Sequence, residues 1–177
     1  MLRGLAFGAM SGLVATMAMT SAMRRLHAHL PPMERYPLPP REITATLLPA
    51  ATRKDGAVTA LLAHFGYGAL TGAIYACLPV RRFPGVLYGP VVWAVSYSAI
   101  WPGAGVLTPA NNHPARRNGL MIVSHVVWGA FLQAGLHELN HPAVGAVAKG
   151  SLRDTRADPA VSNRPRRALR PVDRRRG

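Results

Sequence analysis

The sequence predicts an all-α polytopic membrane protein, in which a bundle of four transmembrane helices precedes a disordered, basic C-terminal tail. Four apolar stretches are each close to the roughly 20 residues that a helix needs to cross hydrocarbon. They are Gly4–Met23, Ala57–Val80, Pro84–Val106 and Asn118–His137. None contains an Asp, Glu, Lys or Arg, so all formal charge lies in loops and tails. We expect a transmembrane domain at 1–138 and a tail at 139–177.

The first stretch is expected to be an uncleaved helix, because its apolar run exceeds that of a typical signal peptide and lacks a small-residue cleavage site. Small residues recur in it at every fourth position, at Gly4, Gly8 and Gly12. The second stretch carries Gly68 and Gly72 at the same spacing. Such stripes let two helix backbones approach closely. We predict a contact between these two helices within the monomer, with a homo-oligomeric contact as the weaker alternative.

The segment between the first two stretches, residues 24–56, is too polar and too rich in proline to enter the bilayer. Pro39-Pro40 would begin a short helix over about 41–48, since proline is tolerated at the first helical positions. Ile43, Leu47 and Leu48 would share one side of it and lie at the membrane interface.

The second and third stretches are joined by Arg81-Arg82-Phe83, which predicts a tight helical hairpin. The third stretch ends at Trp101-Pro102-Gly103, and aromatic residues at the end of a span commonly mark the headgroup level. Beyond the fourth stretch, the chain is rich in Arg, Pro and Asp and has few large apolar residues. Such a composition cannot bury a core, so this part is expected to be disordered.

The chain has a net charge of +14, and this tail holds ten of its 21 Lys and Arg residues. A basic tail on a membrane protein is explained by topology and by anionic lipid headgroups. Nucleic acid is not an expected partner, because aromatic residues do not alternate with the charges. We expect the lipid bilayer as partner, both termini in the cytoplasm, and residues 24–56 and 107–117 outside.

The order of landmarks resembles the YagU-like family of bacterial inner-membrane proteins. The matching motifs are Gly8-Ala9-Met10-Ser11-Gly12, Pro37-Leu38-Pro39-Pro40-Arg41, His64-Phe65-Gly66-Tyr67, Gly105-Val106-Leu107-Thr108-Pro109 and Ser124-His125-Val126-Val127-Trp128. They cover about residues 4 to 135 and leave the tail unmatched. The resemblance implies an inner-membrane helical bundle and draws attention to two histidines, and it supplies no catalytic residue.

These histidines, His64 and His125, each lie seven residues into a span that starts on the same side of the membrane. At about 1.5 Å per residue both would be roughly 10 Å deep. We predict that they point toward one another across the bundle, in a polar site with Tyr67 and Gln133. Polar loop residues would cap this site, namely Arg41, Glu42, Asn111, Asn112 and His113.

Several functions fit such a pair. Each histidine could simply form an interhelical hydrogen bond. Ionisable groups inside spans also mark sites for proton or solute passage, so transport or membrane maintenance is the leading functional hypothesis. The runner-up is haem or metal binding by the same two imidazoles, and a third is a scaffold that recruits a partner or anionic lipid. An enzyme is the least supported class, because no nucleophile with a base, phosphate loop or carboxylate pair occurs in the spans.

Overall fold

The computed structural model describes residues 2–78 and 83–141, and within these residues every regular element is helical. Three helices are long and apolar enough to cross a membrane: α1 (Leu2–His27), α3 (Pro49–Ala76) and α6 (Ala115–Asn140). The remaining elements are η1 (Pro32–Glu34), α2 (Pro39–Leu47), α4 (Gly85–Val95), η2 (Ser96–Ile100), α5 (Trp101–Gly103) and η3 (Ala110–Asn112). The all-helical prediction is confirmed. The predicted tail beyond residue 141 and most of the 81–83 connection lie outside the described residues.

The short helix predicted after the proline pair is α2, which begins with Pro39 and Pro40 in its first turn. It is followed closely by α3, whose regular path is interrupted at Asp55, where φ is −154° and ψ is 86°. The Asp55 carboxylate accepts a hydrogen bond from the Val58 amide at 3.1 Å, as an N-cap residue does. The long regular part of α3 thus begins just after this cap, close to the predicted start at Ala57.

The third predicted span is not a single regular helix, which corrects the expectation of four similar helices. Its first part, α4, contains Pro90 and is followed by the π-helical turn η2 and the short α5. The Trp101 amide bonds the Ser96 carbonyl five residues back. Pro102 has no amide hydrogen and cannot bond to the Ser98 carbonyl four residues back. Because this helical hydrogen bond is missing, the turn can widen to the π-helical form. Helical dihedral angles nevertheless continue from α4 through η2 into α5.

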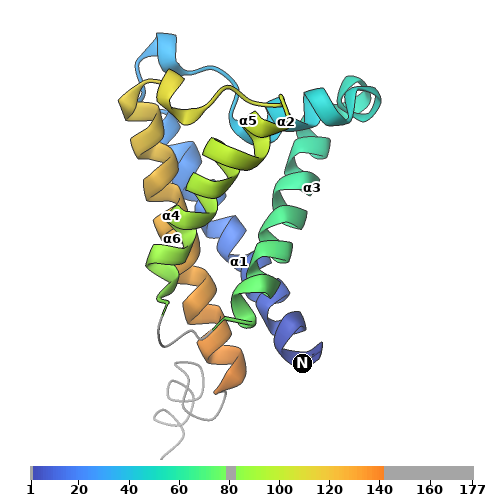
Figure 1. Cartoon of the computed structure of the whole chain (residues 1–177), viewed down its shortest axis with the longest axis vertical. Coiled ribbons are helices and arrows are strands. Elements are labelled where there is room, and N and C mark those ends of the chain that lie inside the picture. The colour runs from blue at the N-terminus through green and yellow to red at the C-terminus, as the bar shows by residue number, and fades with distance from the viewer. Residues whose placement is uncertain (1, 79–82, 142–177) are drawn as a thin grey trace, which may run out of the picture. The chain divides into compact units, whose positions relative to one another are not determined.

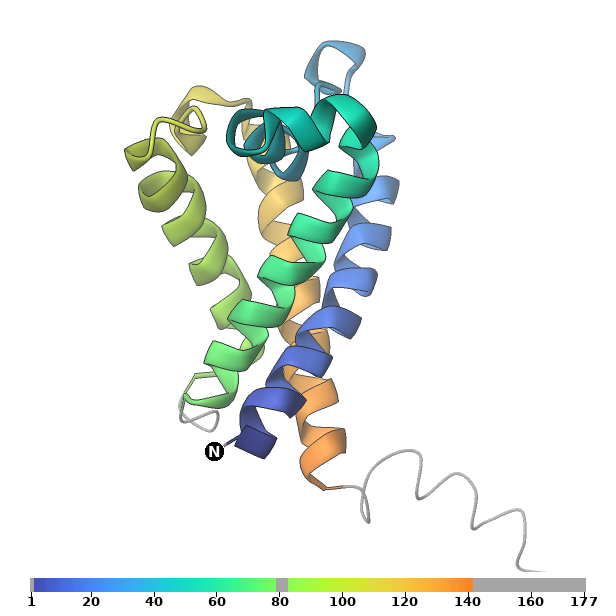
Figure 2. The ribbon, with the colours of Figure 1, turned by 90° about the vertical axis from the view of Figure 1, so that its right-hand side faces the viewer.

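Within the unit formed by residues 1–141, α1 packs between α3 and α6, and α4 packs against α6 (Figure 1). The end of α3 and the start of α4 lie at the same end of the bundle as the N-terminus of α1, whereas α2 lies at the opposite end. In the described part of the chain, α3 and α4 are not among the closely packed pairs. The two helices diverge toward the end that carries α2 (Figure 2). Their adjoining ends remain in contact, since the Tyr88 hydroxyl donates to the Thr71 carbonyl at 2.8 Å and the rings of Tyr75 and Tyr88 lie 4.8 Å apart. The two helices thus form an open hairpin, and the predicted tight connection between them lies mostly outside the described residues.

Glycines set the closest approaches between helices. A methyl group added at Gly8 would collide with the backbone of Gly72, and one added at Gly12 would collide with that of Gly68. The structure thus brings together the two stripes seen in the sequence. Gly4 has open space around it and takes no part in this contact, which corrects its assignment to the packing stripe.

A second glycine contact, between α4 and α6, was not anticipated. Methyl groups at Gly85 and Gly129 would each meet the other residue's backbone, and one at Gly89 would meet the His125 carbonyl. The same four-residue spacing was present in the sequence, at Gly85 and Gly89 and at His125 and Gly129. The pairing was missed because the third stretch was interpreted as the partner of the second in a hairpin.

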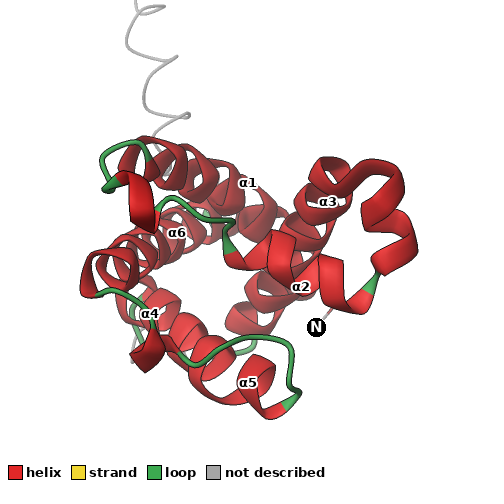
Figure 3. Cartoon of the chain, turned by 90° about the horizontal axis from the view of Figure 1, so that it is seen from above, coloured by secondary structure: helices red, strands yellow, loops and turns green. Residues whose placement is uncertain are grey.

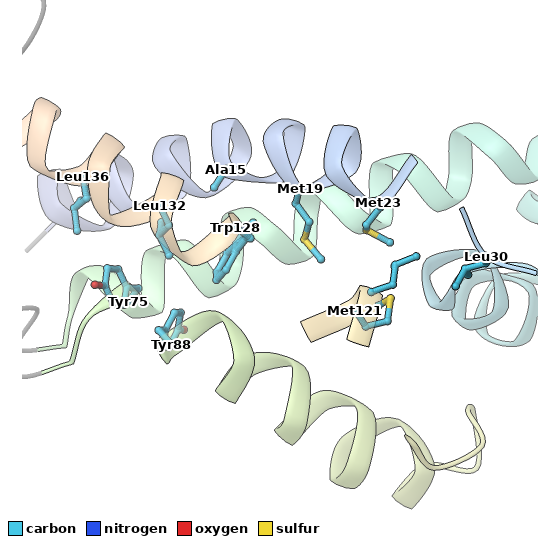
Figure 4. Close-up of a cluster of buried hydrophobic side chains, with 11 residues drawn as sticks. Ala15, Met19, Met23, Leu30, Tyr75, Tyr88, Met121, Trp128, Leu132 and Leu136 are labelled. Carbon is cyan, nitrogen blue, oxygen red and sulfur yellow. The ribbon is translucent and has the colours of Figure 1, made fainter. Parts of the chain in front are cut away.

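The core lies where α1, α3, α4 and α6 converge (Figure 4), and it holds Ala15, Tyr75, Tyr88, Trp128 and Leu132. The outward faces are also apolar. In the most apolar 18-residue stretch of each long helix, only a minority of the residues are buried inside the protein. The buried share is 33% in α1, 22% in α3 and 39% in α6. Exposed side chains on these faces include Met17, Leu62 and Phe131. This is the arrangement of helices that face lipid.

We expect Gly12→Leu and Gly68→Leu each to lower the free energy of unfolding by about 1–3 kcal/mol, because the side chain would force apart two backbones in contact. Gly4→Leu is the matched control on α1, since its Cβ would meet no atom within 4 Å. Unfolding by SDS from a mild detergent micelle measures the effect. Equal stability of all three variants would contradict the contact.

Candidate functional site

A cavity of about 360 Å³ lies between the diverging ends of the helices. Seen from above, the helices surround a central region that α2 partly covers (Figure 3). The cavity is lined by residues of α1, α2, α3, α4, η2, α5 and α6, and most of the lining is apolar. Met19, Ile43, Leu70, Val92 and Met121 are representative. A cavity of this volume falls in the range of about 300–1,000 Å³ that is typical of small-molecule sites.

His64 of α3 and His125 of α6 both line this cavity. Within the described residues, no hydrogen bond or ring contact joins the two imidazoles, and α1 packs between their helices, α3 and α6. The expectation that the rings face one another across the bundle, directly or through a bridging water, stays a prediction. The two histidines thus share a cavity rather than a direct contact.

The hydrogen bond of His125 determines which of its ring nitrogens donates and which can accept a hydrogen bond. Nδ1 lies 2.7 Å from the Met121 carbonyl oxygen, which can only accept, so Nδ1 carries the hydrogen and donates. The neutral ring then has a lone pair on Nε2. His64 has Nε2 buried without a hydrogen-bond partner. Both rings therefore retain unused hydrogen-bonding capacity at the cavity.

Tyr67, the third predicted site residue, also lines the cavity and connects α3 to η2. Its hydroxyl lies 2.6 Å from Ser96 Oγ, which itself donates to the Val92 carbonyl at 2.6 Å. Tyr67 is accordingly the donor to Ser96. Nearby Trp93 also lines the cavity, and its indole Nε1 is buried and has no hydrogen-bond partner among the described residues.

The cavity ends near the α1–α3 glycine contact. Thr16 donates to the Gly12 carbonyl at 2.7 Å and accepts from Trp128 Nε1 at 3.1 Å. Both residues line the cavity, and Thr16 Oγ1 occupies the space that a side chain at Gly68 would need. All three tryptophans of the chain, Trp93, Trp101 and Trp128, line the cavity.

Gln133 does not belong to this site, which corrects its predicted role. Its Oε1 atom accepts a hydrogen bond from the Gly85 amide at 2.7 Å, at the first residue of α4. The side chain thereby satisfies a helix amide that has no partner within its own helix. Gln133 holds α4 against α6 near their glycine contact.

The predicted loop cap is only partly realised. Arg41 lines a second hollow next to the cavity, but Glu42, Asn111, Asn112 and His113 line neither. Asn111 and Asn112 are exposed in η3. Instead, His113 Nε2 donates to the Thr108 carbonyl, Nδ1 accepts a 2.5 Å hydrogen bond from the Tyr36 hydroxyl, and the ring stacks on Tyr36 and contacts Tyr97 at a tilt. It ties the two long loops together above the bundle.

Arg117 is the principal residue that the sequence did not single out. Only 1% of it is exposed, although it stands at the start of α6 beside exposed Arg116. Its guanidinium donates to the carbonyls of Glu34, Tyr36 and Pro37 and lies 3.6 Å from the centre of the Tyr36 ring. It fixes the proline-rich segment that leads into α2. Local sequence gives no signal for this, because two adjacent arginines at a span end are usually both solvated.

Comparisons with protein-family models, with curated proteins and with solved structures find no match for this chain. The resemblance to the YagU-like family stays a prediction based on its short motifs.

We expect Arg117→Lys to destabilise the cover of the cavity by about 1–3 kcal/mol, since an ammonium cannot reproduce a planar fork that both stacks and bonds several carbonyls. Limited proteolysis should then cleave residues 28–38 faster. Arg116→Lys, at an exposed neighbour, is the control and should leave cleavage unchanged. Identical proteolysis of both variants would show that Arg117 does not hold this segment.

Proposed function

We propose that this chain is an integral membrane protein of the bacterial inner membrane that binds a small, largely apolar molecule in the cavity between its helices. The cavity itself is the observation that carries this proposal: it combines apolar walls with a few unsatisfied polar groups. This combination is typical of sites for small organic ligands. Transport or membrane maintenance is the functional class that such a site supports best.

Membrane embedding is supported by the apolar outward faces of α1, α3 and α6. We propose that the α4–α5 run, Gly85–Gly103, crosses as a fourth, irregular segment. Its departures from regular α-helix occur at η2, where Ser96 and Tyr97 line the cavity. Irregular backbone at membrane depth is tolerated where it borders a cavity rather than lipid.

The polar groups specify what the ligand needs. His125 offers a ring-nitrogen acceptor, and Trp93 offers an indole donor that has no partner among the described residues. A hydroxyl or carbonyl group on an otherwise apolar molecule would satisfy these groups. Leaving them unpaired in a low-dielectric site costs about 1–3 kcal/mol each, which favours a ligand that pairs with them.

Haem or metal binding by His64 and His125 is less favoured. Among the described residues, no group of three or more His, Cys, Asp or Glu side chains could hold a metal ion. Two imidazoles without a carboxylate or thiolate would leave most coordination positions to the ligand or to water. A scaffold role through the basic tail concerns residues outside the described part of the chain.

Tryptophan fluorescence can test ligand binding, because all three tryptophans line the cavity. We expect dibromostearyl alcohol, whose bromines quench nearby indoles, to quench the detergent-solubilised protein saturably. Val92→Phe should abolish the saturable phase, since Val92 lines the cavity and the larger ring would fill it. Val91→Phe is the matched control, because Val91 is 45% exposed and points away from the cavity.

Quenching that rises linearly with the brominated alcohol, equally in the parent and both variants, would refute a binding cavity. His125→Ala should weaken the saturable phase without removing it, because the ligand would lose one hydrogen-bond acceptor.

Topology provides a separate test. We propose that both termini lie in the cytoplasm, with the end that carries α2 on the periplasmic side. A reporter fused after Gly177 that is active only in the cytoplasm should therefore be active, and one that is active only in the periplasm should be silent. The reverse result would invert the orientation and leave the cavity proposal intact.

A further inference from the structure

A second hollow, a groove of about 470 Å³, adjoins the cavity at the end of the bundle that carries α2. It lies between the last turns of α1, the segment 35–41 and the first membrane turns of α3. We call it the basic groove. Its lining includes Arg24, His27, Arg35, Arg41 and His64, and none of its lining residues is acidic.

The basic groove and the apolar cavity are adjoining parts of one site. Met23, Pro40 and His64 line both of them. His64 therefore stands at the boundary between the apolar interior and the charged outer part. A molecule that occupies both parts would pass directly beside this ring.

The positive charge of the groove is largely uncompensated. Arg24 and Arg41 are exposed, and in the described part of the chain neither guanidinium forms a hydrogen bond or ion pair. His27 has a ring nitrogen, Nε2, that is buried without a partner. Arg35 is partly engaged, since it donates to the carbonyls of Leu30 at 2.7 Å and Ala28 at 2.9 Å.

We propose that the site binds a single-chain anionic amphiphile, with its carboxylate or phosphate headgroup in the basic groove and its hydrocarbon chain in the apolar cavity. The inference rests on the proposed function and adds the charge and shape of the ligand. Guanidinium groups pair well with both headgroups. The groove lies at the end of α1, where its arginines can meet a headgroup at the membrane surface while the chain stays at hydrocarbon depth.

Other anionic occupants fit less well. A free inorganic anion would use the groove and leave the adjoining apolar cavity without an occupant. A bilayer phospholipid bound only at the surface would require the arginines but not the cavity. The single-chain amphiphile is the class that uses the arginines, His64 and the cavity together.

The experiment compares dibromostearate with dibromostearyl alcohol, which has the same chain and no charge, by tryptophan quenching at a pH where the carboxylate is ionised. Because a hydrogen bond to a carboxylate is stronger than one to a neutral hydroxyl, we expect the acid to bind about tenfold more tightly than the alcohol. Unlabelled lysophosphatidate and oleate, used as competitors, distinguish a phosphate from a carboxylate headgroup. Inorganic phosphate should not compete.

Arg24→Gln and Arg41→Gln should each reduce this preference for the acid and leave the affinity for the alcohol unchanged. Arg53→Gln and Arg116→Gln are the controls, since both residues are exposed and line neither hollow. Saturable binding of acid and alcohol with equal affinity would overturn the anionic headgroup while preserving the proposed cavity function. Competition by inorganic phosphate alone, or acid binding that survives Val92→Phe unchanged, would overturn the amphiphile.

Discussion

The close glycine contacts at one end of the bundle are the constraint on which the other features depend. Gly8 and Gly12 meet Gly72 and Gly68, and Gly85 meets Gly129. All of these contacts lie toward the N-terminal end of α1, where α3 ends and α4 begins. At the other end the helices carry larger side chains, such as Met23 and Met121, and they diverge. Close approach at one end and separation at the other leave a cavity between the helices.

At its open end the cavity is bordered by α2. The buried cation Arg117 holds the proline-rich segment that leads into α2. Arg117 pairs with no carboxylate in the described part of the chain and is held by backbone carbonyls and the Tyr36 ring. Burying a guanidinium is costly unless its donors are satisfied. The extended, proline-rich segment before α2 supplies these acceptors, because its carbonyls are not used in a helix. The cover and the start of α6 are thereby joined.

The irregular α4–α5 run and the polar groups of the cavity are connected. Pro102 removes one helical hydrogen bond, and the π turn η2 places Ser96 and Tyr97 at the cavity wall. Ser96 then accepts the hydrogen bond of Tyr67 from α3. This bond spans two helices that otherwise diverge. The same irregularity explains why the third apolar stretch does not form one long regular helix.

The sequence by itself determined the helical class, the positions of the long apolar helices, the helix after the proline pair and the residues of the α1–α3 glycine stripe. Each follows from local pattern: apolar length, proline placement and four-residue spacing. Only the tertiary structure decided the remaining neighbours, above all the packing of α4 and of α1 against α6. Matched depth placed His64 and His125 at one level, but depth carries no information about angular order around a bundle. The tertiary structure put both rings on one cavity without a direct contact, placed Gln133 at the α4–α6 contact, and buried Arg117 rather than its neighbour against the segment before α2.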